Sequence, residues 1–398
     1  MADIKSYRRE KAKREQIRND YKAKIKRHKL QNVYRVLLVV AALLAVMALV
    51  MVQYKRHVYT GYDTVSTVVL EGSAGAEDVR LKNSVLTYSK DGAHCTNVKG
   101  EVKWNQTYEI QDIIVETCQN VSAIASYNGR EIYVQDTEKQ ISAITTNMPI
   151  KDITVSATGL VTAILSDTNV TWINTYDAFG ELLFTGQAHM DEAGYPVSVS
   201  LSPNGVLLAV TYVYVDAGML KSNVVFYNFG PVGDNMSDHV VGLYFYSDVL
   251  VPEIRFVDNE TAFAVGDNRL MVFKGSQTPT EQAGYIYNKE IQSVFYGDEH
   301  IGLVFVSDDM EHNYMMDVYN STGKKLKTYY FDLEYNDIFF EKDCFVIYNE
   351  NECQIMTYEG REKYNGYFSK AADLLFPADG AYKYVLVTET SIDTIQLK

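Results

Sequence analysis

The hydrophobic pattern first singles out one long apolar stretch near the N-terminus. Residues 36–52 (VLLVVAALLAVMALVMV) contain no charged side chain. A helix of this length is about 25 Å long, close to the thickness of the hydrocarbon core of a bilayer. Tyr34 and Tyr54 flank the run, where interfacial aromatic residues are expected. The pattern predicts a membrane-spanning helix over residues 34–54. A buried core helix is the alternative, but this run has no polar face and is charged on both sides.

Beyond the apolar stretch the pattern changes to short alternating runs separated by turn residues. Val85–Tyr88, Ala123–Tyr127, Val161–Leu165 and Thr171–Tyr176 are examples, and such runs continue to the end of the chain. Alternation with a period of two is typical of half-buried β-strands, and no helical period of useful length appears. The sequence therefore predicts an all-β domain over residues 61–398.

The alternating runs repeat along the chain. Asn97, Asp177 and Asn320 each begin an Asx-x-x-Gly turn between two runs, and Asp136 and Tyr358 begin degenerate copies. In such a turn the Asx side chain caps the backbone and glycine supplies the left-handed residue. Eight runs look like the starts of repeating units, at intervals of 34 to 56 residues: Asp78, Asp112, Asp152, Val197, Glu253, Ile291, Asp337 and Asp373.

This spacing predicts a β-propeller with four strands in each blade. Eight starts indicate eight blades, with seven left open if one start is an inserted hairpin. Two β-sandwiches fit less well, because no linker interrupts the spacing. The unit from Asp373 has room for only three strands, so we expect Val65–Leu70 to complete it and close the ring.

The charged residues set the expected topology. Residues 1–33 carry twelve Lys or Arg and four acidic residues, whereas Lys55 and Arg56 are the only basic residues just after the span. The positive-inside rule then predicts a cytoplasmic N-terminus and an extracytoplasmic C-terminal domain, joined by a linker over residues 55–60. The basic stretch is too long for a cleavable signal peptide, and no small-x-small site follows the span. We therefore expect an uncleaved signal anchor and a single-pass protein of the cell membrane.

The sequence of the cytoplasmic arm, residues 1–33, predicts a charged helix. Ile17, Tyr21 and Ile25 form a narrow apolar stripe at a spacing of four. One interpretation is contact with anionic inner-leaflet lipid or with a cytoplasmic partner. The other is a solvated basic tail that only fixes the topology.

The composition of the exported part excludes some partners. Residues 57–398 hold 47 acidic and 22 basic side chains, a net charge of −25. Such a domain repels nucleic acid, so a DNA or RNA partner is not expected for it. Its cysteines are Cys95, Cys118, Cys344 and Cys353, which are too scattered for a disulfide framework or a C-x-x-C site. A Cys344–Cys353 pair across a hairpin remains open.

Some units resemble known propeller repeats. Tyr88-Ser-Lys-Asp-Gly-Ala followed by Gly100-Glu-Val-Lys-Trp104, and Leu201-Ser-Pro-Asn-Gly205, look like quinoprotein (PQQ-like) and WD40-like repeats. The overall plan is similar to an uncharacterised family of single-pass membrane proteins of Gram-positive bacteria. The resemblance transfers no functional residue. Strict WD40 signatures are absent, as are the adjacent cysteines and tryptophan platform of a quinone dehydrogenase, so no cofactor is expected.

The search for chemistry yields an interaction face rather than a catalytic or metal site. The histidines are isolated, and no H-E-x-x-H, G-x-S-x-G, P-loop or EF-hand pattern is present. In a propeller the loops between second and third strands share one face with the connections between blades. Gln187–Tyr195, Asp216–Ser222 and Asp308–Asn313 are long insertions on that face, and Gly230–His239 and Gln277–Gly284 lie opposite. The candidate residues for a basic partner or a divalent cation are His189, Asp191, Glu192, Asp216, Asp308, Asp309, Glu311 and His312.

Three functions compete at this point. The leading hypothesis is a protein-interaction or scaffolding module at the cell envelope, because propellers present variable loops on a rigid scaffold. A transmembrane sensor is the second, although the span lacks a G-x-x-x-G face. The third is an oxidoreductase or hydrolase with its site over the central channel. That enzyme would need charged side chains from several blades to converge at the channel mouth.

Overall fold

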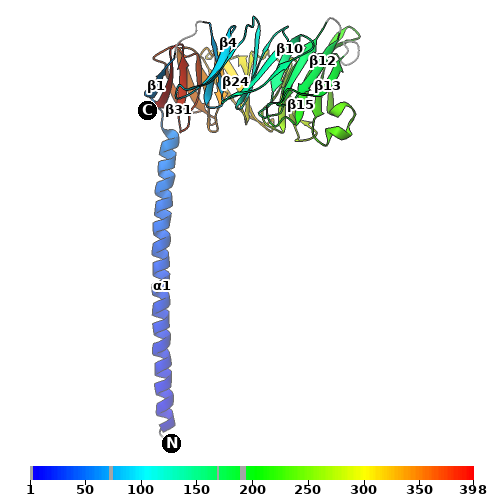
Figure 1. The fold of residues 1–398 in the computed structure, drawn as a ribbon. Coiled ribbons are helices and arrows are strands. Elements are labelled where there is room, and N and C mark those ends of the chain that lie inside the picture. Colours follow the sequence, from blue (N-terminus) through cyan, green and yellow to red (C-terminus); the bar gives the residue numbers. More distant parts are fainter. Residues whose placement is uncertain (1–2, 71–74, 168–169, 189–193) are drawn as a thin grey trace. The chain divides into compact units, whose positions relative to one another are not determined.

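The computed structural model describes residues 3–70, 75–167, 170–188 and 194–398. The chain divides into two compact units, Met1–Val58 and Tyr59–Lys398. The first unit is a single helix, α1 (Asp3–Arg56), of 54 residues (Figure 1). In the described part of the chain, α1 is the one helix long and apolar enough to cross a bilayer, over Ser6–Tyr54. Its apolar side chains from Val36 to Val52 are exposed.

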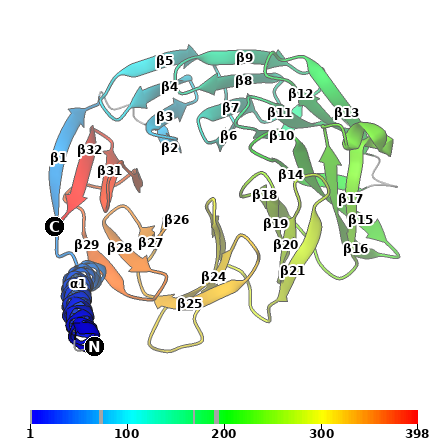
Figure 2. The same ribbon diagram turned by 90° about the horizontal axis from the view of Figure 1, so that it is seen from below.

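The second unit is built from eight antiparallel sheets of four strands each, arranged as blades around a common centre (Figure 2). We number the blades 1 to 8 along the chain and the strands of each blade first to fourth from the centre outward. Blade 1 comprises β2 (Glu77–Leu81), β3 (Ser84–Ser89), β4 (Gly92–Asn97) and β5 (Val102–Thr107), and blade 2 comprises β6 (Ile113–Cys118), β7 (Val121–Ser126), β8 (Glu131–Asp136) and β9 (Gln140–Thr145). Blade 3 comprises β10 (Ile150–Val155), β11 (Val161–Ser166), β12 (Thr171–Tyr176) and β13 (Leu182–Ala188). Blade 4 comprises β14 (Tyr195–Leu201), β15 (Leu207–Asp216), β16 (Met219–Asn228) and β17 (Val240–Tyr246).

Blades 5 to 8 follow the same order. Blade 5 comprises β18 (Glu253–Phe256), β19 (Thr261–Val265), β20 (Arg269–Lys274) and β21 (Thr280–Ile286), and blade 6 comprises β22 (Ser293–Tyr296), β23 (His300–Val306), β24 (Tyr314–Asn320) and β25 (Lys325–Phe331). Blade 7 comprises β26 (Asp337–Phe340), β27 (Cys344–Tyr348), β28 (Glu352–Thr357) and β29 (Glu362–Tyr367). Blade 8 comprises β30 (Leu374–Pro377), β31 (Lys383–Thr388), β32 (Ser391–Leu397) and β1 (Tyr62–Val69). Two short 3-10 helices, η1 (Gly233–Asn235) and η2 (Ser237–His239), interrupt the loop between β16 and β17.

The predicted eight-bladed propeller is confirmed. Each of the eight unit starts read from the sequence lies within two residues of the beginning of a first strand. The largest interval, from Val197 to Glu253, reflects ten-residue strands β15 and β16 and the long loop with η1 and η2, not a ninth sheet. The seven-blade alternative is therefore excluded.

The ring closes as predicted, with the N-terminal strand completing the last blade. β1 pairs antiparallel with β32, from Tyr62 opposite Leu397 to Val69 opposite Ser391. The strand begins three residues before the predicted Val65. Because β1 covers the outer edge of β32, the N-terminal and C-terminal strands of the propeller lie in the same sheet. This sheet therefore has four strands like the others.

The repeated turns have the predicted chemistry. The Oδ1 atom of Asn97 accepts hydrogen bonds from the backbone N–H groups of Lys99 (2.9 Å) and Glu101 (3.0 Å). Gly100 has a φ of +84°, and a Cβ there would come within 2.3 Å of Val68, so only glycine fits. The same capping geometry recurs at Asp177 and Asn320.

The hydrophobic core lies between neighbouring blades. Between blades 4 and 5, for example, Phe226, Phe256 and Phe273 pack together with ring centroids 5.0 to 6.3 Å apart. The alternating aromatic residues of the sequence therefore serve largely as packing between blades, as expected for Phe345, which is fully buried. Each blade contributes one face to the cluster before it and one to the cluster after it.

The Cys344–Cys353 disulfide, which the sequence left open, is not formed. All four cysteines are free. Cys344 lies opposite Thr357 and Cys353 opposite Tyr348, so the two thiols occupy opposite ends of the β27–β28 hairpin. A disulfide requires Cα atoms closer than about 7 Å, which this register does not allow.

Candidate functional site

The loops of the propeller lie on two faces. We call connection face the side that carries the second-to-third strand loops and the connections between blades. We call N-terminal face the opposite side, where the chain enters the propeller at Tyr59–Gly61. There the backbone N–H of Tyr59 donates to the carbonyl of Lys363 (2.7 Å), and that of Thr60 to the carbonyl of Lys398 (2.9 Å).

The structure places five of the eight candidate interaction residues on the connection face. Asp216 ends β15 in blade 4, and the other four, Asp308, Asp309, Glu311 and His312, lie in the loop between β23 and β24 in blade 6. Blade 5 separates the two groups. His189, Asp191 and Glu192 lie outside the described residues. The sequence-predicted set is therefore spread over the face and does not form one cluster.

Several of these acidic residues already have basic partners. The Nζ atom of Lys221 lies 2.6 Å from Asp216 Oδ2, and this hydrogen bond lowers the pKa of the Asp216 carboxyl. Asp308 forms an ion pair with Lys289. His312 Nδ1 lies 3.1 Å from Asp332 Oδ2. Local pairing thus reduces the charge available for an external partner, although the face keeps Asp309 and Glu311 exposed.

The connection face also exposes apolar side chains that the sequence analysis missed. Along β15 and β16 the flanking strands reach only to Val213 and Ser222, so the eight residues between these two positions form a two-stranded hairpin that extends beyond the blade. Near its tip Val215, Met219 and Leu220 are 67, 57 and 53% exposed. Met310, in the acidic loop of blade 6, is fully exposed. The signal in the sequence was an unusually long alternating run on both sides of Ala217-Gly218.

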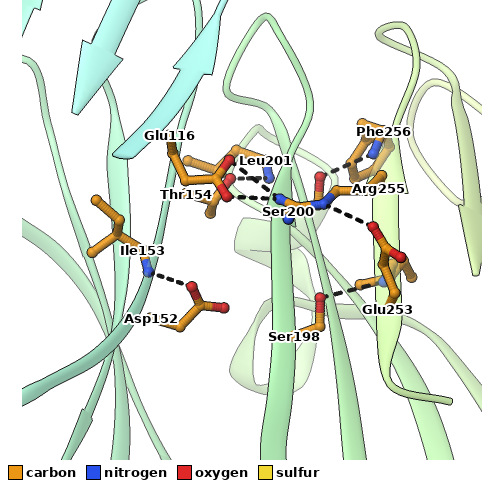
Figure 3. A network of polar contacts seen from close by, with 11 residues as sticks. Glu116, Asp152, Ile153, Thr154, Ser198, Ser200, Leu201, Glu253, Arg255 and Phe256 are labelled. Atoms are coloured by element: carbon orange, nitrogen blue, oxygen red, sulfur yellow. Dashed lines mark hydrogen bonds and ion pairs between the residues drawn. The ribbon is translucent and has the colours of Figure 1, made fainter. Parts of the chain in front are cut away.

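A second concentration of functional groups lies in the central channel. Arg255 on β18 donates from Nη1 to both carboxylate oxygens of Glu116 on β6, at 3.1 and 3.2 Å (Figure 3). Its Nε also lies 3.4 Å from Glu253. Both partners of the Arg255–Glu116 pair are about a quarter exposed. The pair joins blade 2 to blade 5 directly.

Carboxylates outnumber cations in this channel cluster. Two effects raise the pKa of Asp152, on β10, to about 6. Burial is the larger, and the nearby charge of Glu116 adds to it. Burial also raises the pKa of Glu116, while the Arg255 charge opposes this shift. Glu116 and Glu253 contact the guanidinium of Arg255, and Asp152 lies near enough for the Arg255 charge to oppose the rise in its pKa.

Hydroxyl groups bind the first strands of blades 3, 4 and 5 to one another. Ser200 on β14 accepts a hydrogen bond from the N–H of Phe256 (2.9 Å), and Ser198 one from that of Ile254 (3.3 Å) (Figure 3). Thr154 on β10 accepts from the N–H of Leu201 (3.2 Å). The edge of a first strand that faces the channel has no neighbouring strand in its own blade. The hydroxyl groups accept hydrogen bonds from backbone N–H groups along that edge that would otherwise lack a partner.

A cavity of about 460 Å³ opens at the end of the channel next to this cluster, lined by residues of blades 2 to 6. Cys118 lines it, but burial raises the pKa of its thiol to about 11, so it is not a thiolate nucleophile at neutral pH. No group of three or more His, Cys, Asp or Glu side chains that could hold a metal ion occurs in the described part of the chain. The channel thus brings charged residues together in mutually satisfied pairs.

Comparison with known proteins identifies the family. A family model described as a family of unknown function (DUF5711) matches residues 55–397. The chain belongs to the DUF5711 family. No curated protein matches its sequence.

Solved structures of similar fold support the architecture of this DUF5711 propeller. BamB from Moraxella catarrhalis is 13% identical, with a TM-score of 0.50 over 85% of this chain and 100% of that chain. Sqt1 from Saccharomyces cerevisiae is 10% identical, with a TM-score of 0.52 over 86% of this chain and 99% of that chain. Sqt1 from Chaetomium thermophilum, solved bound to the N-terminus of the ribosomal protein L10, is 10% identical, with a TM-score of 0.52 over 85% and 100% of the two chains. At these identities the likeness shows the fold alone.

Proposed function

We propose that this chain is a single-pass membrane protein whose propeller acts as a protein-interaction scaffold on the extracytoplasmic side. The proposal rests on one observation, the free-standing hairpin at the end of β15 and β16 with its exposed Val215, Met219 and Leu220. Exposed apolar side chains at a loop tip cost solvation free energy, and a partner that covers them recovers it.

The acidic loop of blade 6, which shares the connection face with the hairpin but is separated from it by blade 5, suggests the character of the partner. Asp309 and Glu311 are exposed in the loop of blade 6, beside the fully exposed Met310. A partner long enough to cross blade 5 would meet both the apolar hairpin and the acidic loop, which fits a protein segment that carries apolar anchors and basic residues. One propeller of similar fold, Sqt1 from Chaetomium thermophilum, was solved bound to a protein segment, the N-terminus of the ribosomal protein L10.

Support for the membrane anchor comes from α1. Its apolar residues between Val36 and Val52 are exposed along the helix, as they would be toward lipid. Twelve basic residues precede them, so the positive-inside rule leaves residues 1–33 in the cytoplasm and residues 55–398 outside, with 55–60 as the linker. The same basic arm has the composition for contact with anionic lipid.

The proposal is tested by site-specific photo-crosslinking of the full-length protein in its membrane. A photoreactive phenylalanine analogue replaces Met219 in one variant and Phe179 in another. Phe179 is the matched control, because it is 87% exposed and lies in a third-to-fourth strand turn on the N-terminal face. We expect a discrete protein adduct from position 219 and none from position 179. Adducts from position 179 alone would contradict the proposed face.

One observation favours an enzyme as a second candidate function. The channel brings Glu116, Asp152 and Arg255 together from three blades, which is the convergence that a channel-mouth active site requires. The ion pair between Arg255 and Glu116 favours a structural role instead. Screening hydrolase substrates against the wild type and Asp152→Asn decides between them: a turnover abolished by this isosteric change, without loss of fold, supports the enzyme.

A further inference from the structure

A larger cavity lies where the ring closes, between blade 8 and blade 1. It has a volume of about 650 Å³ and opens between two blades that are not consecutive in sequence. Blade 1 contributes polar side chains from all four of its strands, and blade 8 contributes two acidic residues from its loops. The residues that matter for its chemistry are Asp78, His94, Thr96, Asn105, Asp373 and Glu389.

The polar side chains of blade 1 form a continuous row across the sheet. Asp78 on β2 lies opposite Thr87 on β3, Thr87 lies opposite His94 on β4, and His94 lies opposite Asn105 on β5. Residues paired in this way across antiparallel strands point to the same side of the sheet. All four line the cavity. The row therefore lies along the cavity from the centre of the propeller toward its rim.

In blades 3 and 6 the matching position holds a polar residue that is satisfied within its own blade. In blade 3, Asn174 accepts a hydrogen bond of 2.6 Å from Thr185 on the fourth strand. In blade 6, Asp317 accepts one of 2.6 Å from Thr328 and a second of 2.7 Å from Lys325. In blade 1 the third-strand residue is His94, which makes no hydrogen bond with any described residue. His94 therefore differs from Asn174 and Asp317 in having no hydrogen-bond partner within its own blade.

Thr96 supplies an independent indication that the cavity is built for a ligand. Its side chain is only 2% exposed, and its hydroxyl has no hydrogen-bond partner among the described residues. A buried hydroxyl without a partner costs free energy unless something in the cavity satisfies it. Thr96 lies on β4, two residues from His94, and lines the same cavity.

The charge of the cavity is uncompensated. Asp78, Asp373 and Glu389 line it, and no Lys or Arg occurs among the described residues of its wall. Burial raises the pKa of Asp373, and the neighbouring charges of Asp78 and Glu389 raise it as well, so the three carboxyl groups lie close enough to interact. Burial lowers the pKa of His94, which leaves the imidazole neutral at pH 7.

We propose that the cavity between blades 8 and 1 binds an organic cation, whose ammonium or guanidinium group is held by the carboxylates of Asp78, Asp373 and Glu389. Such a group carries several N–H donors, and carboxylates accept them in charge-assisted hydrogen bonds. The rest of the ligand lies along His94 and Asn105, with the Thr96 hydroxyl as a further polar contact. The carboxylates suit this wider cationic group better than a metal ion, because no three His, Cys, Asp or Glu side chains in the described part of the chain lie close enough together to hold one.

The test is isothermal titration of the full-length protein in discs of zwitterionic lipid, which avoids binding of the probes to anionic headgroups. The probes are n-butylguanidine, its neutral isostere n-butylurea, and the tripeptide acetyl-Gly-Arg-Gly-amide. We expect the guanidine to bind at least 10-fold more tightly than the urea, since hydrogen bonds to charged groups exceed neutral ones by this margin. Stronger binding of the tripeptide than of the guanidine assigns the cation to a protein side chain, and the reverse to a small molecule.

Two substitutions locate the binding and one controls for fold. Asp78→Asn keeps an oxygen for the hydrogen bond from Thr87, which is 2.5 Å long in the native protein, and is expected to weaken butylguanidine binding at least 10-fold. Glu389→Gln, in an exposed loop, is expected to weaken it several-fold. Glu181→Gln, in an exposed turn of blade 3, leaves it unchanged. Equal binding of guanidine and urea, no binding of any probe, or full binding to Asp78→Asn would each overturn the proposal.

Discussion

Arg255 of blade 5 donates from one nitrogen to both carboxylate oxygens of Glu116 of blade 2, across the central channel, at 3.1 and 3.2 Å. The two residues are 139 positions apart in sequence. Because both are largely removed from water, removing one partner leaves an uncompensated charge in the channel.

Removing Arg255 is therefore expected to destabilise the propeller more than removing Glu116. Arg255→Met leaves Glu116, Asp152 and Glu253 as unbalanced carboxyl groups and is expected to cost about 3 kcal/mol. Glu116→Gln keeps a hydrogen-bond acceptor and is expected to cost about half as much. In thermal unfolding, the double variant Glu116→Gln/Arg255→Met should lose less than the sum of the two single substitutions. Additive losses would show that the pair contributes no coupling energy.

Asp152 is expected to make stability depend on pH. The groups that face it are Glu116, Arg255 and Tyr195. Its pKa is about 6 in the folded chain against an ordinary value of 3.8. The folded state thus binds the proton more tightly, and wild-type stability falls as the pH rises from about 4 to about 6. Asp152→Asn keeps an acceptor for the N–H of Ile153 and should be more stable than the wild type above pH 6, on the order of 1–2 kcal/mol.

Below pH 4 that advantage should vanish, because the wild-type carboxyl is then protonated in both states. The measurement is the unfolding midpoint of both proteins between about pH 3 and pH 8. A difference that stays constant across this range would rule out titration of Asp152 as its cause.

The fold could be predicted from the sequence because its determinants are local. In the Asx-x-x-Gly turns at Asn97 and Asn320, the Asn side chain accepts hydrogen bonds from backbone N–H groups of the same five residues. The sequence of the turn therefore suffices to predict it. Closure of the ring followed from counting strands, since the unit from Asp373 has three. Every step depended on spacing along the chain and not on the identity of distant neighbours.

The sites could not be predicted in the same way. The partners of the Glu116–Arg255 pair lie on blades 2 and 5 and become neighbours only through the curvature of the ring. The seam cavity joins Asp78 to Asp373, from the two ends of the domain. On the connection face, the sequence shows that residues 308–311 are mostly acidic. It does not show the ion pair of Asp308 with Lys289, because this pair links a loop within blade 6 to the connection between blades 5 and 6.

Deleting β1 is expected to prevent cooperative folding of the propeller. Removal of residues 62–69 exposes the outer edge of β32 and removes Val68 from the cluster that contains Val85 and Phe376. An uncovered strand edge promotes aggregation. The matched control removes residues 1–58, which form a separate compact unit, and should leave the unfolding temperature unchanged. Size-exclusion chromatography and thermal unfolding check both outcomes.

The proposed topology predicts which residues an impermeant reagent reaches. Ser6 in α1 and Ser237 in η2 are both exposed, so each can be changed to cysteine for labelling. A membrane-impermeant maleimide added to intact cells without a wall should label Ser237→Cys and spare Ser6→Cys, and lysis should make both accessible. Labelling of Ser6→Cys before lysis would reverse the orientation.

The apolar hairpin and the acidic loop are expected to contribute differently to binding a partner. Apolar anchors at the centre of an interface mainly slow dissociation, whereas charges at its rim mainly speed association and lose effect as salt rises. With the partner identified by crosslinking at position 219, Met219→Ser/Leu220→Ser should raise the dissociation rate at least 10-fold at any salt concentration. Asp308→Asn/Asp309→Asn/Glu311→Gln should lower the association rate several-fold at low salt and have little effect at 0.5 M salt.

Surface plasmon resonance with the full-length protein measures both rates. The control is Asp234→Asn/Asp238→Asn in the loop 230–239, because that loop joins the third and fourth strands of blade 4 and so lies on the N-terminal face. Its rates should match those of the wild type. Sensitivity of binding to this control, with the hairpin and acidic-loop variants unaffected, would place the partner on the opposite face. Binding lost only in the hairpin variant would keep the connection face but remove the electrostatic contribution of Asp308, Asp309 and Glu311.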